Sequence, residues 1–470
     1  MNIKIRTKTG ITLLMLVMSI TSLVSNTSPK KTNDTIIYQA ENSLMNGVLV
    51  RKKGSGFSGK GYVTDFNNRN DFAEFHINAP SSGYYELKVG YRVLRGQGNK
   101  RTNIVLNGKK EGEISLVESN NFTESRGIVV KLREGMNNLK FMSDWGYYDL
   151  DYIKIKFSSK HDISNIKNKL ANTHATKEAQ ELMNFLVETY GKKIISGQQQ
   201  ISYVESIHSV TGKRPAIVGF DLKDYSPSLA QHGISSKEVL QAIKWHREGG
   251  IVEIQWHWNA PKDLKDWSHG YYSNQTSFDI KYALSNHQST DYKLLIRDID
   301  AIAVQLETLQ KANVPILFRP LHEAEGGWFW WGAKGPEPAK ELYRLLFNRL
   351  TYHFKINNLI WIWNSSSPEW YPGDKYVDIV SYDSYPSPMS YNSVQNEYKK
   401  LAKLVRNKKI VTMSENGSIP EPNNIFYDKA YWSWFLTWEN CISTDNSLDH
   451  VRKVYNDPNV ITLSDLKNYF

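Results

Sequence analysis

The chain has 470 residues, of which 40% are hydrophobic and 23% are charged. This length and composition suit two or three domains with apolar cores and exclude an intrinsically disordered protein. The formal net charge is +10, but 58 basic residues are dispersed among 48 acidic ones, so we expect no nucleic-acid partner. The single cysteine, Cys441, cannot form an internal disulfide, so the fold must rest on packing.

The N-terminus has the pattern of a secretory signal peptide. Lys4, Arg6 and Lys8 precede an apolar run over residues 11–24, which has the length of a signal-peptide core and is too short for a membrane span. We therefore assign residues 1–25 to a signal peptide and predict a secreted, extracellular protein. No cysteine lies near the cleavage region, so we expect neither a lipid anchor nor an integral membrane segment after signal removal.

Residues 36–157 carry the signals of short strands. Apolar and polar residues alternate over 85–93 and again over 151–157, and Asn107-Gly108 is a hairpin signal between two runs. This pattern predicts an antiparallel β-sandwich of roughly 120 residues. We find no paired catalytic residues in it.

The two ends of this segment and its glycine-rich stretch, residues 54–63, resemble a family 35 carbohydrate-binding module. The matching ends are Tyr38 to Asn42 and Trp145 to Tyr152. The resemblance implies a structural calcium shared by Glu41 and Asp151, because hard oxygen ligands suit that ion. Trp145 lies in a loop with Tyr147 and Tyr148, and the sequence leaves open whether it is a sugar-stacking platform or a core residue.

A second domain is expected over residues 173–470, after a polar linker at 158–172 that lacks periodicity. A helical pattern over 176–190 is followed by alternating strand and helix signals, and one helix is expected to begin with a capping box formed by Ser235 and Glu238. Eight strands in roughly 300 residues predict a (β/α)8 TIM barrel. A doubly wound sheet is the alternative, but no glycine-rich phosphate loop supports it. The strands are expected near Ile194, Ala216, Val252, Ile316, Ile360, Ile379, Val411 and Phe435.

Two of these strands end in glutamates. The run 314–318 leads through Arg319-Pro320 to His322 and Glu323, and the run 409–413 leads to Glu415. Because all strand C-termini share one face of a barrel, we expect the two carboxyl groups to lie close together. Glutamate is rarely buried unless it is paired, and an acid between a histidine and the aromatic cluster 328–331 suits a general acid of raised pKa. No HExxH or comparable ligand spacing accompanies the pair, which disfavours metal-dependent hydrolysis.

The sequences RPLHE and GGWFWWG, followed by SENG, resemble glycoside hydrolase family 26, the retaining β-mannanases and their relatives in clan A. Other clan A families usually have asparagine before the acid, whereas His322 follows the family 26 pattern. The resemblance implies that Glu323 is the acid/base and Glu415 the nucleophile, with no cofactor for catalysis. It also implies substrate contacts on five further residues, to which we add Asp221 and Trp256 at neighbouring predicted strand ends. The five are His257, His322, Trp328, Tyr385 and Trp438.

We therefore predict a secreted, monomeric, retaining endo-β-1,4-mannanase that acts on mannan, glucomannan or galactomannan. Two alternatives remain open. The same fold and mechanism could act on another β-glycan, such as mixed-linkage β-glucan or β-1,3-xylan. A non-catalytic polysaccharide-binding protein is the second alternative, and the intact glutamates at positions 323 and 415 argue against it.

Overall fold

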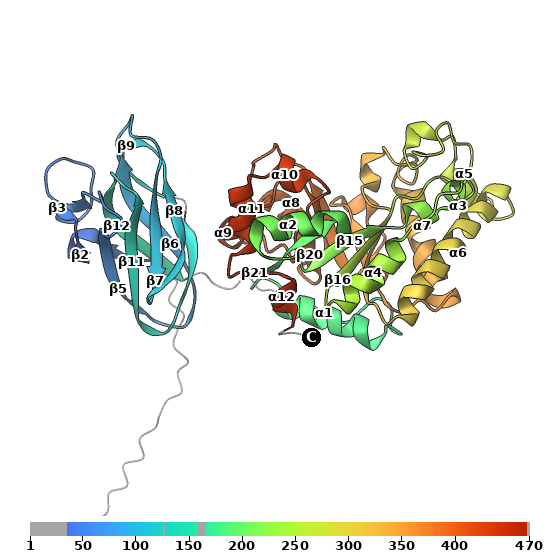
Figure 1. Cartoon of the computed structure of the whole chain (residues 1–470), viewed down its shortest axis with the longest axis horizontal. Coiled ribbons are helices and arrows are strands. Elements are labelled where there is room, and N and C mark those ends of the chain that lie inside the picture. The colour runs from blue at the N-terminus through green and yellow to red at the C-terminus, as the bar shows by residue number, and fades with distance from the viewer. Residues whose placement is uncertain (1–34, 126, 158–165, 468–470) are drawn as a thin grey trace, which may run out of the picture.

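The computed structural model describes residues 35–125, 127–157 and 166–467. These residues form an N-terminal β-sandwich and a C-terminal α/β barrel (Figure 1). The predicted signal peptide, residues 1–25, and the first half of the predicted linker lie outside the described residues. Within the described part of the chain, no helix has both the length and the apolar character needed to cross a membrane.

The N-terminal domain consists of two antiparallel sheets that pack face to face. One sheet has the order β10-β6-β12-β4-β3, with β1 paired to β12 and β9 paired to β6, and the other has the order β2-β5-β11-β7-β8. Its strands are β1 (Thr35–Gln39), β2 (Leu44–Asn46), β3 (Leu49–Arg51), β4 (Tyr62–Thr64), β5 (Phe72–Ala79), β6 (Gly83–Val93), β7 (Lys100–Leu106), β8 (Lys109–Leu116), β9 (Ser119–Glu124), β10 (Ile128–Leu132), β11 (Gly135–Trp145) and β12 (Asp149–Phe157).

The sandwich predicted from alternation and turn chemistry is confirmed. The inward-facing side chains of β6 are buried at every second position, from Tyr85 to Val93. Asn107 and Gly108 both have positive φ, 50° and 85°, which is the conformation that the predicted β7–β8 hairpin requires. Pairing of β1 with β12 joins the two ends of the domain, because Gln39 lies opposite Tyr152.

The C-terminal domain is built on a seven-stranded parallel sheet in sequential order. Residues 433–437 close it: Thr437 forms parallel bridges with Gln198 on one side and Asn416 on the other. This segment occupies the place of the eighth strand, so the predicted barrel is confirmed, although the closing segment pairs too briefly to form a regular strand. The strands are β14 (Gly197–Gln199), β15 (Ile217–Asp221), β16 (Ile251–Trp256), β17 (Ile316–Pro320), β18 (Leu359–Asn364), β19 (Ile379–Ser384) and β20 (Ile410–Asn416).

Amphipathic helices surround the barrel, and a short parallel pair, β13 (Ile194–Ile195) with β21 (Val460–Ile461), lies beside it. The strands are buried along most of their length, as parallel strands covered by helices should be. The helices are α1 (Lys177–Thr189), α2 (Val204–Thr211), α3 (Pro227–Ala230), α4 (Glu238–Arg247), α5 (Ile280–Ser285), α6 (Thr290–Lys311), α7 (Pro336–Asn348), α8 (Gln395–Leu404), α9 (Pro422–Tyr427), α10 (Cys441–Thr444), α11 (Leu448–Tyr455) and α12 (Leu463–Leu466).

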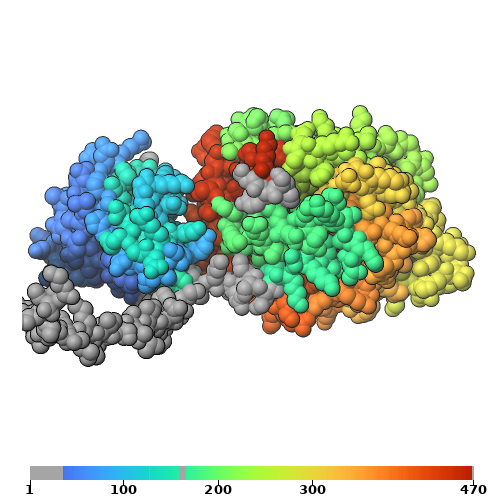
Figure 2. Space-filling model, turned by 90° about the horizontal axis from the view of Figure 1, so that it is seen from below, coloured from blue at the N-terminus to red at the C-terminus, as the bar shows by residue number. Residues whose placement is uncertain are grey.

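The described part of the predicted linker, residues 166–172, lies against the barrel. The Ala171 N–H donates to Asp378, and Leu170 is part of the barrel core. The sandwich also contacts the C-terminal part of the barrel (Figure 2): Lys453 of α11 lies 3.5 Å from Glu113 of β8.

Candidate active site

The two predicted catalytic glutamates meet at the C-terminal end of the barrel. Glu415 is the penultimate residue of β20, and Glu323 follows β17 by three residues. Glu323 adopts a left-handed backbone conformation, φ 52°, and its N–H donates to Asn364 Oδ1 at 2.8 Å. One carboxyl oxygen of each glutamate and one of Asp383 lie within 4.8 Å of one another. A left-handed backbone at a non-glycine residue such as Glu323 is strained, and such strain is common where a side chain must point into a functional site.

Arg319, buried on β17, lies beneath these acids and organises them. Its guanidinium donates to Glu253 at 2.9 Å, to Asp383 at 3.1 Å and to Glu415 at 2.7 Å, and it also donates to Gln255. A planar guanidinium with five donors suits such a buried acidic cluster. Removal of Arg319 would leave buried carboxylates without their counter-ion.

The two glutamates differ in their hydrogen-bond partners. Glu415 accepts from Arg319 and, at 2.6 Å, from the hydroxyl group of Tyr385. Glu323 accepts from Trp328 Nε1 at 2.8 Å, and the rest of its carboxyl group faces Asp383. Trp328 and Tyr385 are 48% and 49% exposed, so both present ring surface beside the acids.

Both acids have a raised pKa, and their hydrogen-bond partners differ. Burial, followed by the negative charge of Asp383, raises the pKa of Glu323 to about 7. Burial, followed by the same Asp383 charge, also raises the pKa of Glu415 well above its usual value, although the Arg319 cation and the Tyr385 hydroxyl oppose that rise. Burial and nearby carboxylates keep the pKa of Tyr385 far above its usual value, so Tyr385 remains a donor. Glu323 can therefore retain a proton near neutral pH, and Glu415 is the acid whose carboxylate form receives hydrogen bonds from a cation and a phenol.

Two predicted substrate-binding histidines form one wall of the site. His257 follows β16, and its Nδ1 lies 2.5 Å from Asp221 Oδ2 at the end of β15. His257 Nε2 lies 3.1 Å from His322 Nε2. His322 is only 1% exposed, because the rings of His257, Phe329 and Trp331 surround it.

Some aromatic residues near the site expose a ring face, and others are buried in the core. Trp438 is half-buried, with its ring 6.1 Å from that of His257. Trp256 is in the core, stacked on Trp258 with ring centroids 4.1 Å apart, so its ring is not placed to stack on a sugar. Trp330 and Trp331 are buried as well, and they hold the loop that carries Trp328.

Sequence reasoning missed Glu253 and Gln255, which lie on β16 and contact Arg319. Burial raises the pKa of Glu253 to about 7, against the effect of Arg319. A glutamate and a glutamine within the mainly apolar strand IVEIQW were the available signal, because a buried acid needs a partner.

Comparison with known proteins agrees with this geometry. The profile of glycosyl hydrolase family 26 matches residues 171–465, and that of carbohydrate binding module family 35 matches residues 36–158. A mannan endo-1,4-β-mannosidase of Thermothelomyces thermophilus is 41% identical over 443 residues, which are 92% of this chain and 90% of that protein. Mannan endo-1,4-β-mannosidase A of a Piromyces species is 31% identical over 478 residues, 97% of this chain and 76% of that protein.

A solved structure gives the same result for both domains. The crystal structure of a Podospora anserina GH26-CBM35 β-(1,4)-mannanase has a TM-score of 0.67 and 41% identity, and it covers 93% of this chain and 100% of that one. The buried acid pair at the strand ends lies in the segment that the catalytic family profile matches. The chain therefore belongs to glycosyl hydrolase family 26 and carries an N-terminal carbohydrate binding module of family 35.

Proposed function

We propose that this enzyme hydrolyses internal β-1,4 linkages of mannan with retention of anomeric configuration. The observation that carries the proposal is the pair of carboxyl oxygens of Glu323 and Glu415 within 4.8 Å. Retaining glycosidases hold their two carboxyl groups about 5–5.5 Å apart, whereas inverting enzymes leave room for a water molecule between them. The named relatives, which are mannan endo-1,4-β-mannosidases, support the choice of mannan.

The contacts of the two acids support different roles in a double displacement, with Glu323 as the acid/base and Glu415 as the nucleophile. Glu323, which retains its proton, protonates the leaving glycosidic oxygen while Glu415 attacks the anomeric carbon and forms a glycosyl-enzyme. Glu323, now ionised, then takes a proton from water, which releases the sugar from Glu415. Trp328 orients Glu323, and Tyr385 and Arg319 hold Glu415 in place.

A polysaccharide panel tests this function. We expect reducing ends to appear rapidly from mannan, glucomannan or galactomannan, and slowly or not at all from barley β-glucan and β-1,3-xylan. A fast fall in viscosity relative to the release of reducing ends would indicate internal cleavage. Preference for barley β-glucan or β-1,3-xylan would replace mannan as the substrate, and inactivity on all of them would contradict the enzyme function.

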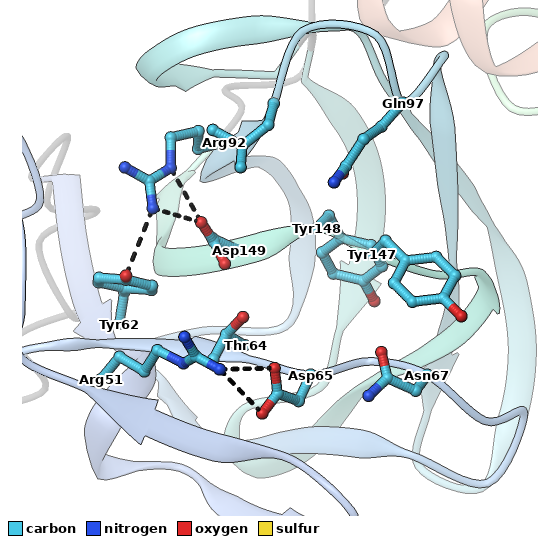
Figure 3. Close-up of a pocket in the computed structure, with 11 residues that line it drawn as sticks. Arg51, Tyr62, Thr64, Asp65, Asn67, Arg92, Gln97, Tyr147, Tyr148 and Asp149 are labelled. Atoms are coloured by element: carbon cyan, nitrogen blue, oxygen red, sulfur yellow. Dashed lines mark hydrogen bonds and ion pairs between the residues drawn. The ribbon is translucent and has the colours of Figure 1, made fainter.

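We propose that the sandwich binds a neutral glycan in a pocket of about 280 Å³ at one edge of its sheets (Figure 3). Tyr147 presents an aromatic ring at this pocket, 63% exposed and on a left-handed backbone with φ 70°. Two ion pairs line the pocket, Arg92 with Asp149 at 2.6 Å and Arg51 with Asp65 at 3.3 Å. Because each cation faces an acid, the pocket offers hydroxyl groups both donors and acceptors without a net charge.

The residues predicted to hold calcium fit that ion, and we propose that they bind it. Glu41 Oε2 is buried without a hydrogen-bond partner among the described residues, which is unusual for a carboxylate oxygen. Asp151 lies on the adjoining strand β12, and its pKa is raised to about 6 by burial, with a contribution from the negative charge of Glu41. Gln39 Oε1 adjoins the site, because a Cβ on Gly59 would lie within 3 Å of both it and Glu41 Oε1. Bound calcium would neutralise the two acids and join the ends of the domain.

We further propose that the enzyme is secreted, since the apolar pattern of residues 11–24 is that of a signal-peptide core, and that it acts as a monomer. N-terminal sequencing of protein from the culture medium should begin near residue 26. Light scattering should give the mass of one chain. Retention of the full N-terminus inside the cell would contradict secretion.

A further inference from the structure

Three side chains in the wall of the active site form a hydrogen-bonded chain: Asp221, His257 and His322. Asp221 lies at the end of β15, His257 follows β16 and His322 follows β17, so three neighbouring strands contribute one residue each. The side chain of His257 is 13% exposed. His257 is thus the histidine of the pair that a substrate can reach, since His322 is enclosed.

The carboxylate of Asp221 has no acceptor position left for a sugar hydroxyl. Its Oδ1 accepts the N–H groups of His257, at 3.0 Å, and of Lys223, at 2.8 Å. Its Oδ2 accepts from His257 Nδ1 and, at 3.3 Å, from Gln255 Nε2. A carboxylate offers about four lone-pair sites, and these four contacts use them. Burial opposes ionisation of Asp221, but the hydrogen bonds from His257 and from the Lys223 N–H hold its pKa below the usual value.

An ionised carboxylate can only accept, so the proton of neutral His257 lies on Nδ1 and the lone pair on Nε2. His322 must then donate from its own Nε2. Burial, together with the positive charge of Arg319, keeps the pKa of His322 well below its usual value, so His322 is neutral and its Nδ1 carries a lone pair. That nitrogen is buried and has no hydrogen-bond partner within the described chain. The alternative arrangement places the His257 proton on Nε2 and the His322 proton on Nδ1. It would bury an unpaired N–H at His322 Nδ1, which proteins rarely tolerate.

We propose that Asp221 is a positioning residue that holds the His257 proton on Nδ1, so that His257 Nε2 acts as an acceptor toward the substrate. In the free enzyme Nε2 accepts from His322, and in the complex it accepts from a hydroxyl group of the sugar bound beside Glu323. The active site therefore favours a sugar whose hydroxyl group donates a hydrogen bond to His257 Nε2. This proposal rests on the proposed hydrolysis of a β-glycan, but the state of the histidine rings is measurable without substrate.

The test combines one substitution with a spectroscopic readout. In Asp221→Asn, the amide oxygen should keep accepting the two backbone N–H groups, which turns the amide nitrogen toward His257 Nδ1. A donor at that place moves the proton of His257 to Nε2 and forces that of His322 to Nδ1. With ¹⁵N-labelled histidine, ring nitrogen shifts should therefore report Nδ1–H for His257 in the parent enzyme and Nε2–H in Asp221→Asn. The spectrum of His257→Gln identifies the His257 signals among the 12 histidines.

Kinetics add a second readout. We expect kcat on mannan to fall about 10- to 100-fold in Asp221→Asn, the usual effect of misplacing one buried hydrogen bond at a reacting site. The matched control is Asp266→Asn, which removes the carboxylate from an exposed Asp–His pair, Asp266 with His269 at 2.8 Å. This control should leave both kcat and the His257 signals unchanged.

Three results would overturn the proposal: an Nε2–H tautomer of His257 in the parent enzyme, an unchanged tautomer in Asp221→Asn, or a loss confined to KM. If Asp221→Asn does not fold, the tautomer of the parent enzyme alone decides. Inactivity of the parent on every β-glycan would contradict the proposed function and leave the tautomer result standing.

Discussion

The proposed catalytic glutamates differ in the groups that stabilise their charge. Glu415 accepts from a buried arginine and from a phenol, whereas Glu323 accepts from an indole, and the Asp383 carboxylate lies close to both acids. A cation and a hydroxyl donor favour an ionised nucleophile at Glu415, and burial without a hydrogen bond from Arg319 favours a protonated acid at Glu323. Substitution of each glutamate should therefore have distinct kinetic effects.

In Glu415→Ala the group that forms the covalent intermediate is lost, so we expect turnover to fall by several orders of magnitude on polymer and on aryl β-mannosides alike. In Glu323→Ala the polymer should also be cleaved poorly, because its sugar leaving group needs a proton. An aryl β-mannoside with a good leaving group should still form the glycosyl-enzyme and give a burst with a low apparent KM. Added azide should restore turnover and yield the β-azide. A burst in Glu415→Ala, with Glu323→Ala inactive on aryl substrates, would reverse the two assignments.

The pKa of Glu323 predicts the alkaline limb of the pH profile. Its value of about 7 in the free enzyme means that the protonated form needed for the first step decreases as pH rises through 7. We expect kcat/KM on mannan to decline above about pH 7, approaching tenfold per pH unit. In Glu323→Gln, assayed with an aryl β-mannoside, that limb should disappear. An alkaline limb that persists in Glu323→Gln would show that a residue other than Glu323 causes it.

At the scale of elements, the loop after β17 carries both Glu323 and Trp328 and depends on a close backbone contact. A Cβ added at Gly332 would lie 1.9 Å from the carbonyl oxygen of Ala324, the residue after Glu323. We expect Gly332→Ala to destabilise the barrel by about 1–3 kcal/mol and to lower kcat, because the loop must move to relieve the overlap.

Thermal unfolding and mannan hydrolysis measure these two effects. Gly112→Ala is the control, since a Cβ there meets only a side-chain atom, at 3.4 Å. Unchanged stability and activity in Gly332→Ala would show that this loop is not held by the contact.

The same elements show what the sequence could predict. The apolar strand runs, the hairpin at Asn107-Gly108 and the strand-end glutamates depend on local pattern, and the structure contains them. The capping box expected from Ser235 and Glu238 is wrong: α4 begins at Glu238, whose carboxylate accepts the Asp221 N–H instead. A carboxylate near a helix start can serve either partner, and only tertiary packing decides between them.

Contacts between side chains on different strands could not be predicted from the sequence for a similar reason. The contacts of Arg319 with Glu253 and Gln255 depend on the register of β16 with β17, which no local pattern specifies. The same register aligns Trp256 with Pro320, and the Trp256 side chain lies in the core. A side chain at a strand end can point either toward the active site or into the core, and its position in the sequence does not decide between the two.

At the scale of the whole molecule, the proposed calcium site should make the stability of the sandwich depend on both the ion and pH. Without calcium, the folded-state pKa of Asp151, about 6, exceeds its usual value of 3.8, so the folded protein retains a proton that the unfolded chain releases. Stability of the calcium-free protein should therefore fall as pH rises from about 4 to above 6. Calcium removes this cost by binding the ionised form.

Calorimetry with and without a chelator measures the effect. We expect calcium to raise the unfolding temperature of the sandwich strongly at pH 7.5 and weakly at pH 5, and Glu41→Gln to reduce the response. An unfolding temperature that a chelator leaves unchanged at pH 7.5 would contradict the calcium site.

The stereochemistry of the first-formed product shows whether hydrolysis passes through a glycosyl-enzyme. If Glu415 forms a glycosyl-enzyme that water then hydrolyses with help from Glu323, two inversions at the anomeric carbon give net retention. Proton NMR during the first minutes of mannan hydrolysis should show the β-anomer of the new reducing end before mutarotation produces the α-anomer. An α-anomer that appears first would mean a single displacement by water and would contradict the account.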